Sequence, residues 1–175
     1  MLEGKSVNLR IIEKEDLPLF LRWINDPAFF GEYNPLEQET KVEMEKDYDT
    51  ARPGRQRFFV EKKDGTKIGV IGVFPEGDLW EVGFALVSGE RGKGYGMEAV
   101  TIMVDYLFLS RNLVRIQAKT DVRNMVSQSL LERVGFKKEG VVRKSMFIYG
   151  EWRDMLLYSI LREEWKEPKI LTKTT

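Results

Sequence analysis

Residues 90–100 read ERGKGYGMEAV, with glycines at positions 92, 94 and 96 and basic side chains at Arg91 and Lys93. A glycine-rich turn into a helix leaves the first N–H groups of the helix without partners and lets an anion approach them closely. The pattern therefore predicts a phosphate-binding loop. The alternative is that the glycines only make a tight turn and allow close helix packing.

Two common phosphate-binding patterns fit this loop poorly. An ATP-binding P-loop requires Ser or Thr after Gly-Lys, whereas Gly94 follows Lys93. A dinucleotide-binding loop requires a third glycine where this chain has Met97. Asp121 does end the next expected strand, where such a loop needs an acidic residue. A nicotinamide-dependent enzyme therefore stays open as an alternative.

The composition removes several kinds of chemistry and partner. The chain has no Cys and no His, which excludes disulfides and a cysteine nucleophile, and we expect no metal. Lys plus Arg and Asp plus Glu each total 28. We therefore expect no nucleic-acid or membrane partner. Because no apolar run reaches the roughly 18 residues of a membrane span and no signal peptide is evident, we expect a cytoplasmic protein.

The elements that must position this loop alternate between strands and helices. A chain of 175 residues has the size of one domain, and we expect a single domain over residues 1–175. Periodicity predicts strands at residues 6–11, 79–87, 113–120, 141–150 and 152–161, a hairpin over 55–74, and helices at 16–27, 36–48, 92–110 and 124–136. Asp16 and Gly135 are the expected N-cap and C-cap residues, and turns are expected at Asp64-Gly65 and Gly150-Glu151. The order indicates an α/β protein with a mixed sheet.

Several segments together resemble the GNAT superfamily of N-acetyltransferases. "RGKGYG" is similar to its Arg/Gln-x-x-Gly-x-Gly/Ala loop, and "EVGFALVSGERGKGYG", "DVRNMVSQSLLERVGF" and "IYGEWRDMLLYSIL" follow in the family's order. The spacing resembles the RimJ/RimL-like branch, which is also close to spermidine acetyltransferases. This resemblance implies a mixed, mostly antiparallel sheet of about seven strands with about four helices. It also implies that the fourth and fifth strands splay apart.

The resemblance implies that the co-substrate is acetyl-CoA and places it on the chain. The pantetheine arm would lie against the backbone of Phe84, Ala85 and Leu86. The N–H groups of the loop would hold the pyrophosphate, at Arg91, Gly92, Lys93, Gly94, Tyr95, Gly96 and Met97. Asn124 and Ser127 would face the other side of the cofactor. For Asn124, a helix N-cap is the alternative.

Acetyl transfer to nitrogen requires a neutral amine, a donor for the carbonyl oxygen and a proton for the thiolate. Without Cys we expect direct attack, with Glu81 as base, the N–H near Leu86 as oxyanion donor and Ser127 beside the thiolate. Glu81 could instead be a charge on the polar face of a strand. Leu131 and Met146 stand where relatives have a Tyr and a Glu. A CoA-binding protein without catalysis therefore stays open.

The acceptor is expected to be an N-terminal α-amine of a protein or peptide, such as a ribosomal protein. An α-amine with a pKa of about 7.7–8.0 is partly neutral at pH 7, whereas a lysine-like amine near 10.4 is not. The alternative is spermidine or another small amine, and a homodimer is allowed. Glu32, Tyr33, Glu37 and Trp80 are the candidate acceptor-binding residues. The acidic series of Glu32, Glu37, Glu39, Glu43 and Glu45 would attract a cation or form a solvated helix face, with Met44 and Tyr48 buried. Phe29 and Phe30 could line the same wall.

Overall fold

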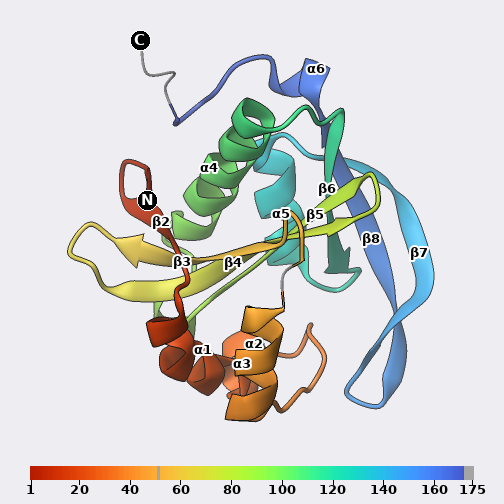
Figure 1. Cartoon of the computed structure of the whole chain (residues 1–175). Coiled ribbons are helices and arrows are strands. Elements are labelled where there is room, and N and C mark those ends of the chain that lie inside the picture. The colour runs from red at the N-terminus through yellow and green to blue at the C-terminus, as the bar shows by residue number, and fades with distance from the viewer. Residues whose placement is uncertain (51, 172–175) are drawn as a thin grey trace.

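A single mixed sheet organises the protein (Figure 1), a computed structural model of which describes residues 1–50 and 52–171. The sheet has eight strands in the order β1-β2-β3-β4-β5-β6-β8-β7. Only the β5–β6 pair is parallel. The described residues form six α-helices, more than the expected four. The added elements are short: β1 (Leu2–Glu3), α2 (Pro27–Phe30) and α6 (Arg162–Trp165).

The N-terminal part places a helical layer on one face of the sheet. Strand β2 (Val7–Ile11) is followed by the 3-10 turn η1 (Lys14–Asp16), α1 (Leu17–Ile24), α2 and α3 (Lys41–Asp49). Asp16 is the N-cap of α1, but its carboxylate binds Glu13 N and Arg10 rather than the helix. Helix α3 starts later than expected because Thr40 and Glu43 form a capping box there.

The middle of the chain forms the centre of the sheet. Strands β3 (Gln56–Lys62), β4 (Lys67–Glu76) and β5 (Leu79–Leu86) are antiparallel neighbours. The turn expected at Asp64-Gly65 is confirmed. Gly65 has φ +85°, a left-handed conformation that glycine adopts without strain.

The remaining elements build a crossover unit and a long hairpin. Helix α4 (Tyr95–Ser110) connects β5 to the parallel strand β6 (Arg115–Asp121), and α5 (Met125–Val134) follows. Gly135 ends α5 with φ +119°, as expected. In the hairpin of β7 (Lys137–Ile148) and β8 (Glu151–Leu161), the turn residues are Tyr149 and Gly150. The turn thus lies one residue before the expected position.

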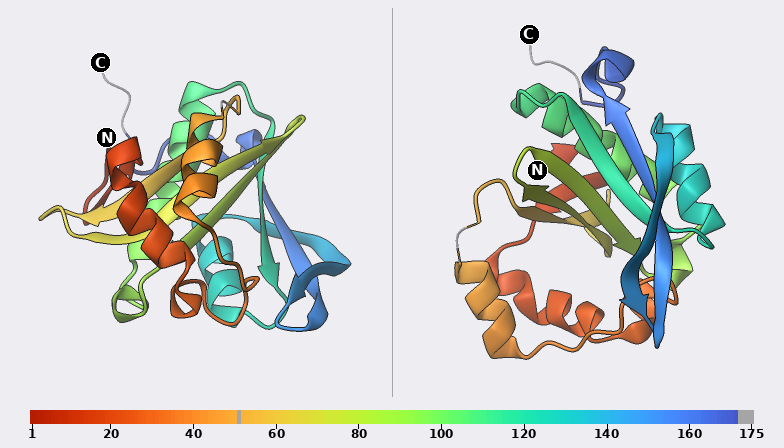
Figure 2. Two further views of the ribbon diagram at one scale, coloured as in Figure 1. Left: turned by 60° about the horizontal axis from the view of Figure 1, so that its bottom comes forward. Right: turned by 90° about the vertical axis from the view of Figure 1, so that its right-hand side faces the viewer.

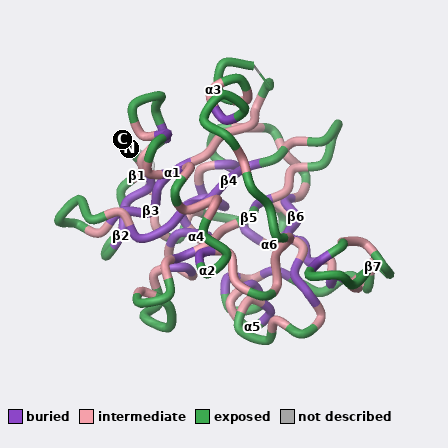
Figure 3. Tube along the Cα trace, turned by 90° about the horizontal axis from the view of Figure 1, so that it is seen from below, coloured by how far each residue is buried: buried purple, intermediate pink, exposed green. Residues whose placement is uncertain are grey.

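Helices lie on both faces of the sheet (Figure 2), and an apolar core fills each side. The larger core joins α4 and α5 to residues such as Val82, Ile116 and Tyr158. The smaller core joins α1 and α2 to residues such as Phe59 and Val70. Buried residues follow the central strands and α4, whereas β7 is largely exposed (Figure 3). No helix in residues 1–50 or 52–171 is long and apolar enough to cross a membrane.

Candidate active site

Strands β5 and β6 diverge after a single point of contact. Their one registered pair is Glu81 opposite Gln117. On β5, Val87 donates its N–H to Ile68 O of β4 at 2.9 Å. Because peptide groups of successive strand residues point to alternate sides, Phe84 and Leu86 direct theirs toward β6, and Ala85 directs its own toward β4. Among the residues that the structure describes, the gap therefore has a free N–H and C=O at Phe84 and a free N–H at Leu86, whose carbonyl oxygen accepts from Arg91 Nε.

The glycine loop presents a run of backbone donors at the start of α4. Within the described part of the chain, no acceptor contacts the N–H groups of residues 92–97. The first helical bond is donated by Glu98 to Gly94 O at 3.1 Å. Gly92 and Gly94 have φ values of +75° and +86°. Six consecutive free N–H groups at the positive end of a 16-residue helix suit a bound pyrophosphate.

The basic side chains of this loop are used within the fold. Arg91 Nε donates to Leu86 O at 2.9 Å and Arg91 Nη2 to Phe29 O at 2.7 Å. Lys93 pairs with Glu90 at 3.0 Å, and Lys62 binds the same carboxylate at 2.8 Å. Arg91 therefore holds the end of β5 against α2, and the backbone offers the exposed donors.

Gly96 has a packing role that the sequence did not separate from anion binding. A Cβ atom there would lie 3.1 Å from Leu130 Cδ1 and 3.5 Å from Leu86 Cδ1. Gly96 therefore lets α5 approach the start of α4. Ser127 lies one turn before Leu130 on α5 and so shares that face of the helix. Helical spacing therefore predicts that Ser127 lies on the side of α5 that faces the glycine loop.

Asn124 is the N-cap of α5. Its Oδ1 atom accepts a hydrogen bond from Ser127 N at 3.1 Å, as the alternative interpretation expected. The cap occupies the side-chain oxygen, and the hydroxyl of Ser127 takes no part in it. Leu131, in place of the tyrosine of relatives, is buried in the larger core.

Glu81 lies on the face of β5 opposite α4 and is bound from β6. Its Oε2 atom accepts from Gln117 Nε2 at 3.1 Å and is 3.2 Å from Lys119 Nζ. The side chain of Glu81 remains 32% exposed, so an acceptor can approach it. Gln117 and Lys119 were not singled out from the sequence. They could have been identified from the sequence, because they alternate with the apolar Ile116 and Ala118 along β6 and so share the opposite face of the strand.

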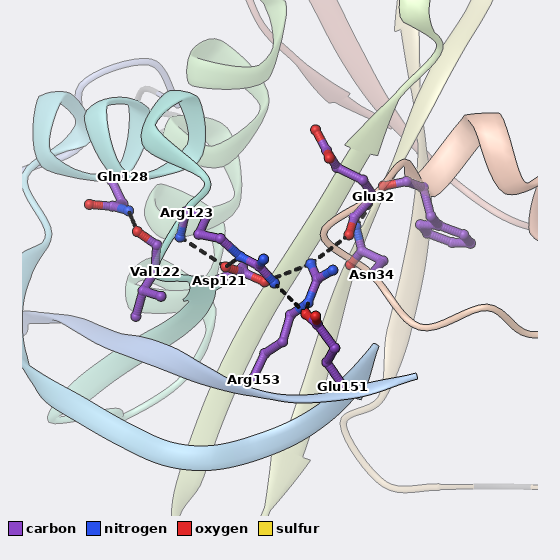
Figure 4. A network of polar contacts seen from close by, with 9 residues as sticks. Glu32, Asn34, Asp121, Val122, Arg123, Gln128, Glu151 and Arg153 are labelled. Carbon is purple, nitrogen blue, oxygen red and sulfur yellow. Dashed lines mark hydrogen bonds and ion pairs between the residues drawn. The ribbon is translucent and has the colours of Figure 1, made fainter. Parts of the chain in front are cut away.

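A polar network closes the end of β6 against the loop after α2 (Figure 4). Arg153 Nη1 is 3.1 Å from Asp121 Oδ2 and donates to Glu32 O at 2.8 Å. Asp121 is buried and also accepts from Arg123 N at 2.8 Å. Its carboxylate is therefore committed to the fold, which leaves no free acidic group for the ribose of a dinucleotide. A hollow of about 560 Å³ lies beside Glu32, Tyr149 and Arg153.

Two of the five residues of the acidic series have partners within their own segment. Glu43 caps α3, and Glu45 is 3.7 Å from Lys41. Asp47 is paired with Arg52, Arg55 and Arg57. Glu32 and Glu37 are exposed. Met44 is buried as expected, but Tyr48 is 40% exposed, because it lies on the solvent side of the short helix.

The aromatic residues expected in the acceptor wall have different positions. Trp80 lies on the α4 face of β5, opposite to Glu81, with the Arg111 guanidinium 4.7 Å from its ring. Trp80 and Glu81 face opposite sides because they are neighbours on a strand, and the role of Trp80 in acceptor binding stays a prediction. Phe29 is buried and stacks on Trp23 at 4.9 Å, and Phe30 packs against Phe29 at 5.0 Å. Tyr33 is half-buried beside Glu32.

This combination of splayed strands and glycine loop has counterparts among known proteins. The family described as the acetyltransferase (GNAT) domain matches residues 6–137. The chain is 31% identical to the uncharacterized N-acetyltransferase p20 of Bacillus licheniformis, over 94% of this chain and 97% of that protein. The chain belongs to the GNAT acetyltransferase family. It is an acetyl-CoA-dependent N-acetyltransferase, and both branches expected from the sequence are represented among its relatives.

Those relatives differ in the acceptor that their names give. The ribosomal protein uS5-alanine N-acetyltransferase of Escherichia coli is 33% identical over 48% of this chain and 43% of its own. The spermidine N(1)-acetyltransferase of Escherichia coli is 26% identical over 94% of this chain and 91% of its own. The spermidine N-acetyltransferase of Vibrio cholerae, solved with CoA and spermine, superposes with a TM-score of 0.83 at 24% identity, covering 93% of this chain and 99% of its own. This structural likeness shows the fold.

Proposed function

We propose that this GNAT enzyme acetylates the N-terminal α-amine of a protein or peptide, such as a ribosomal protein. The charges around Glu81 carry the proposal. Lys119 lies 3.2 Å from its carboxylate. Like charges disfavour a second cation. A site of this kind favours an amine that is already partly neutral at pH 7 over a polycation.

The carboxylates of residues 43–47 support the same choice. A polyamine needs free carboxylates along its length, whereas Glu43, Glu45 and Asp47 already have partners in the fold. Glu32 and Glu37 remain exposed and could contact a cationic group of either acceptor. The full-length match to a spermidine acetyltransferase keeps a polyamine as the second candidate.

The proposed residue roles follow from the positions of the side chains and peptide groups. Acetyl-CoA supplies the acetyl thioester, with its pyrophosphate on the N–H groups of residues 92–97. The amine nitrogen bonds to the acetyl carbon and the C–S bond breaks. Glu81 accepts the proton that the amine loses, directly or through water, and Leu86 N–H donates to the acetyl oxygen. The Ser127 hydroxyl donates to the departing sulfur, the role that Leu131 cannot fill.

The test compares two acceptors and maps the product. We expect kcat/KM for a Ser- or Ala-initiated peptide to exceed that for spermidine, with mass spectrometry placing the acetyl group on the α-amine. The same peptide with a blocked N-terminus is the control and should not react. A preference of more than about tenfold for spermidine, or about 1.4 kcal/mol of transition-state discrimination, would overturn the proposed acceptor.

A further inference from the structure

A second cavity lies under the N-terminal helical layer, on the sheet face that carries Glu81. Its volume is about 380 Å³, and residues from β2, α1, α3 and the start of β3 line it. Ile12, Leu17 and Phe20 give it an apolar wall. A cavity of this size with an apolar wall and a few polar groups is typical of small-molecule sites.

The polar side of this cavity carries more positive than negative charge. Asp47 Oδ1 is 2.9 Å from Arg52 Nη2 and 3.1 Å from Arg55 Nη1, and its Oδ2 is 3.0 Å from Arg57 Nη2. Glu39 adds a second carboxyl group that interacts with Arg57. Three guanidinium groups still outnumber these carboxylates. Each guanidinium has five N–H donors, so many donors remain after the contacts with Asp47.

Two of these arginines are held in place by aromatic rings. The Arg57 guanidinium lies 5.4 Å from the Phe20 ring, and that of Arg55 lies 5.7 Å from the Phe74 ring. Arg55 Nε is buried without a hydrogen-bond partner among the residues that the structure describes. Burial, followed by the charge of Arg57, lowers the pKa of Arg55. A bound anion would relieve the repulsion between these guanidinium groups.

We infer that this cavity binds the carboxylate of an apolar organic acid. The hydrocarbon part lies on Ile12, Leu17 and Phe20, and the carboxylate meets Arg52, Arg55 and Arg57. The carboxylate has two possible sources, a free short-chain acid or an acidic side chain of the acceptor peptide. The second source rests on the proposed function. It is geometrically reasonable because Phe74, which Arg55 contacts, is the cross-strand neighbour of Glu81.

The first experiment uses hexanoate as the probe and hexanol as its uncharged match. Calorimetry should show saturable hexanoate binding that is at least about fivefold weaker in the Arg52→Gln/Arg57→Gln double variant. Hexanol should bind more weakly than hexanoate. Arg22→Gln, at an exposed arginine of α1, should leave hexanoate affinity unchanged.

A variant that is expected to increase hexanoate affinity controls for loss of folding. Asp47→Asn removes the carboxylate that competes for the three arginines, so hexanoate should bind more tightly. A partly unfolded protein cannot give that result. Equal hexanoate affinity in the wild type, the double variant and Asp47→Asn would overturn the inference for a free acid.

The second experiment compares α-amine peptides that carry Glu or Gln at positions three to five. A Glu preference of at least about fivefold in kcat/KM that disappears in the double variant assigns the cavity to the acceptor. Hexanoate binding without a peptide preference assigns it to a free acid. Neither hexanoate binding nor a peptide preference would overturn the inference. If no peptide is acetylated, the proposed acceptor fails while the hexanoate titration still decides this site.

Discussion

The carboxylate of Glu81 is oriented before any acceptor arrives. Gln117 and Lys119 both contact Oε2, at 3.1 and 3.2 Å, from the adjacent parallel strand. Fixing a reactive group in advance reduces the entropy lost on reaching the transition state. The ammonium of Lys119 also disfavours a protonated amine beside it. Orientation therefore suits a proton acceptor, and the charge of Lys119 suits a weakly basic amine as the acceptor of the acetyl group.

Replacing Glu81 with Gln should separate this role from a structural one. Gln keeps the shape of the side chain and can still accept from Gln117, but it cannot take up a proton. We expect kcat to fall by roughly 10²- to 10⁴-fold, with little change in CoA affinity. Steady-state kinetics across pH and CoA calorimetry check this. Glu76→Gln, at the exposed end of β4, is the matched control. An unchanged pH-rate profile in Glu81→Gln would contradict a role as base.

Ser127 can be tested without disturbing the cap of α5. The Asn124 cap bonds to Ser127 N, so Ser127→Ala keeps that hydrogen bond. If the hydroxyl stabilises the leaving thiolate, kcat should fall by about tenfold or more while the free energy of unfolding stays nearly constant. Ser129→Ala, at an exposed serine of the same helix, should change neither quantity. Equal kcat values for Ser127→Ala and Ser129→Ala would indicate that water, and not Ser127, stabilises the leaving thiolate.

At the scale of elements, two glycines of the glycine loop have different structural roles. Gly94 is needed for its backbone conformation, with φ +86° and nothing within 4 Å of an added Cβ. Gly96 is needed for contact with α5, since an added Cβ would meet Leu130 at 3.1 Å. A substitution at Gly96 would therefore disturb helix packing as well as any anion site. Gly94 is the cleaner position for an experiment.

Gly94→Ala should destabilise the protein by about 1 kcal/mol through backbone strain alone. Chemical unfolding measures this cost. Gly140→Ala is the matched control, because Gly140 also has nothing within 4 Å but no positive φ. If the loop binds pyrophosphate, Gly94→Asp should in addition weaken CoA binding measured by calorimetry. Undiminished CoA affinity in Gly94→Asp would contradict that role of the loop.

The sequence was sufficient for the order of these elements but not for their pairing. Apolar alternation predicted β5 and β6. Glycines indicated where α4 begins and where α5 ends. Both patterns are local in the sequence. The contact of Glu81 with Lys119 depends on β5 and β6 being parallel neighbours. The expected helix at 36–48 was too long because its acidic residues fit a helix at every position. Only the capping box of Thr40 and Glu43 sets the true start.

At the scale of the whole molecule, a net charge of zero conceals how the charges are distributed. The acidic series suggested a surface for a cation, yet the next carboxylate along the chain, Asp47, is paired with Arg52, Arg55 and Arg57. Sequence distance gives no measure of which charges meet across a fold. The assignment of the acceptor therefore depends on the pairing that the fold produces. The same pairing produces the cationic cavity, which no motif indicated.

Ion pairs also join the N-terminal helical layer to the sheet. Arg10 of β2 binds both carboxylate oxygens of Asp16, at 2.9 and 2.8 Å, and Glu61 of β3 at 2.8 Å. These hydrogen bonds from Arg10 lower the pKa of Asp16. Because the pKa is lower in the folded than in the unfolded chain, where it is about 3.9, the ionised carboxylate stabilises the fold above that pH. The contribution is lost as pH falls through the folded-state pKa.

Asp16→Asn should therefore cost stability at pH 7, by about 1–3 kcal/mol for hydrogen bonds to a charged group. The difference from the wild type should shrink as the pH is lowered below about 3.9. Urea unfolding of both proteins between pH 7 and pH 3 measures it, with Asp78→Asn at an exposed turn as the control. A difference that stays constant over this range would mean that Asp16 does not stabilise the fold through its charge.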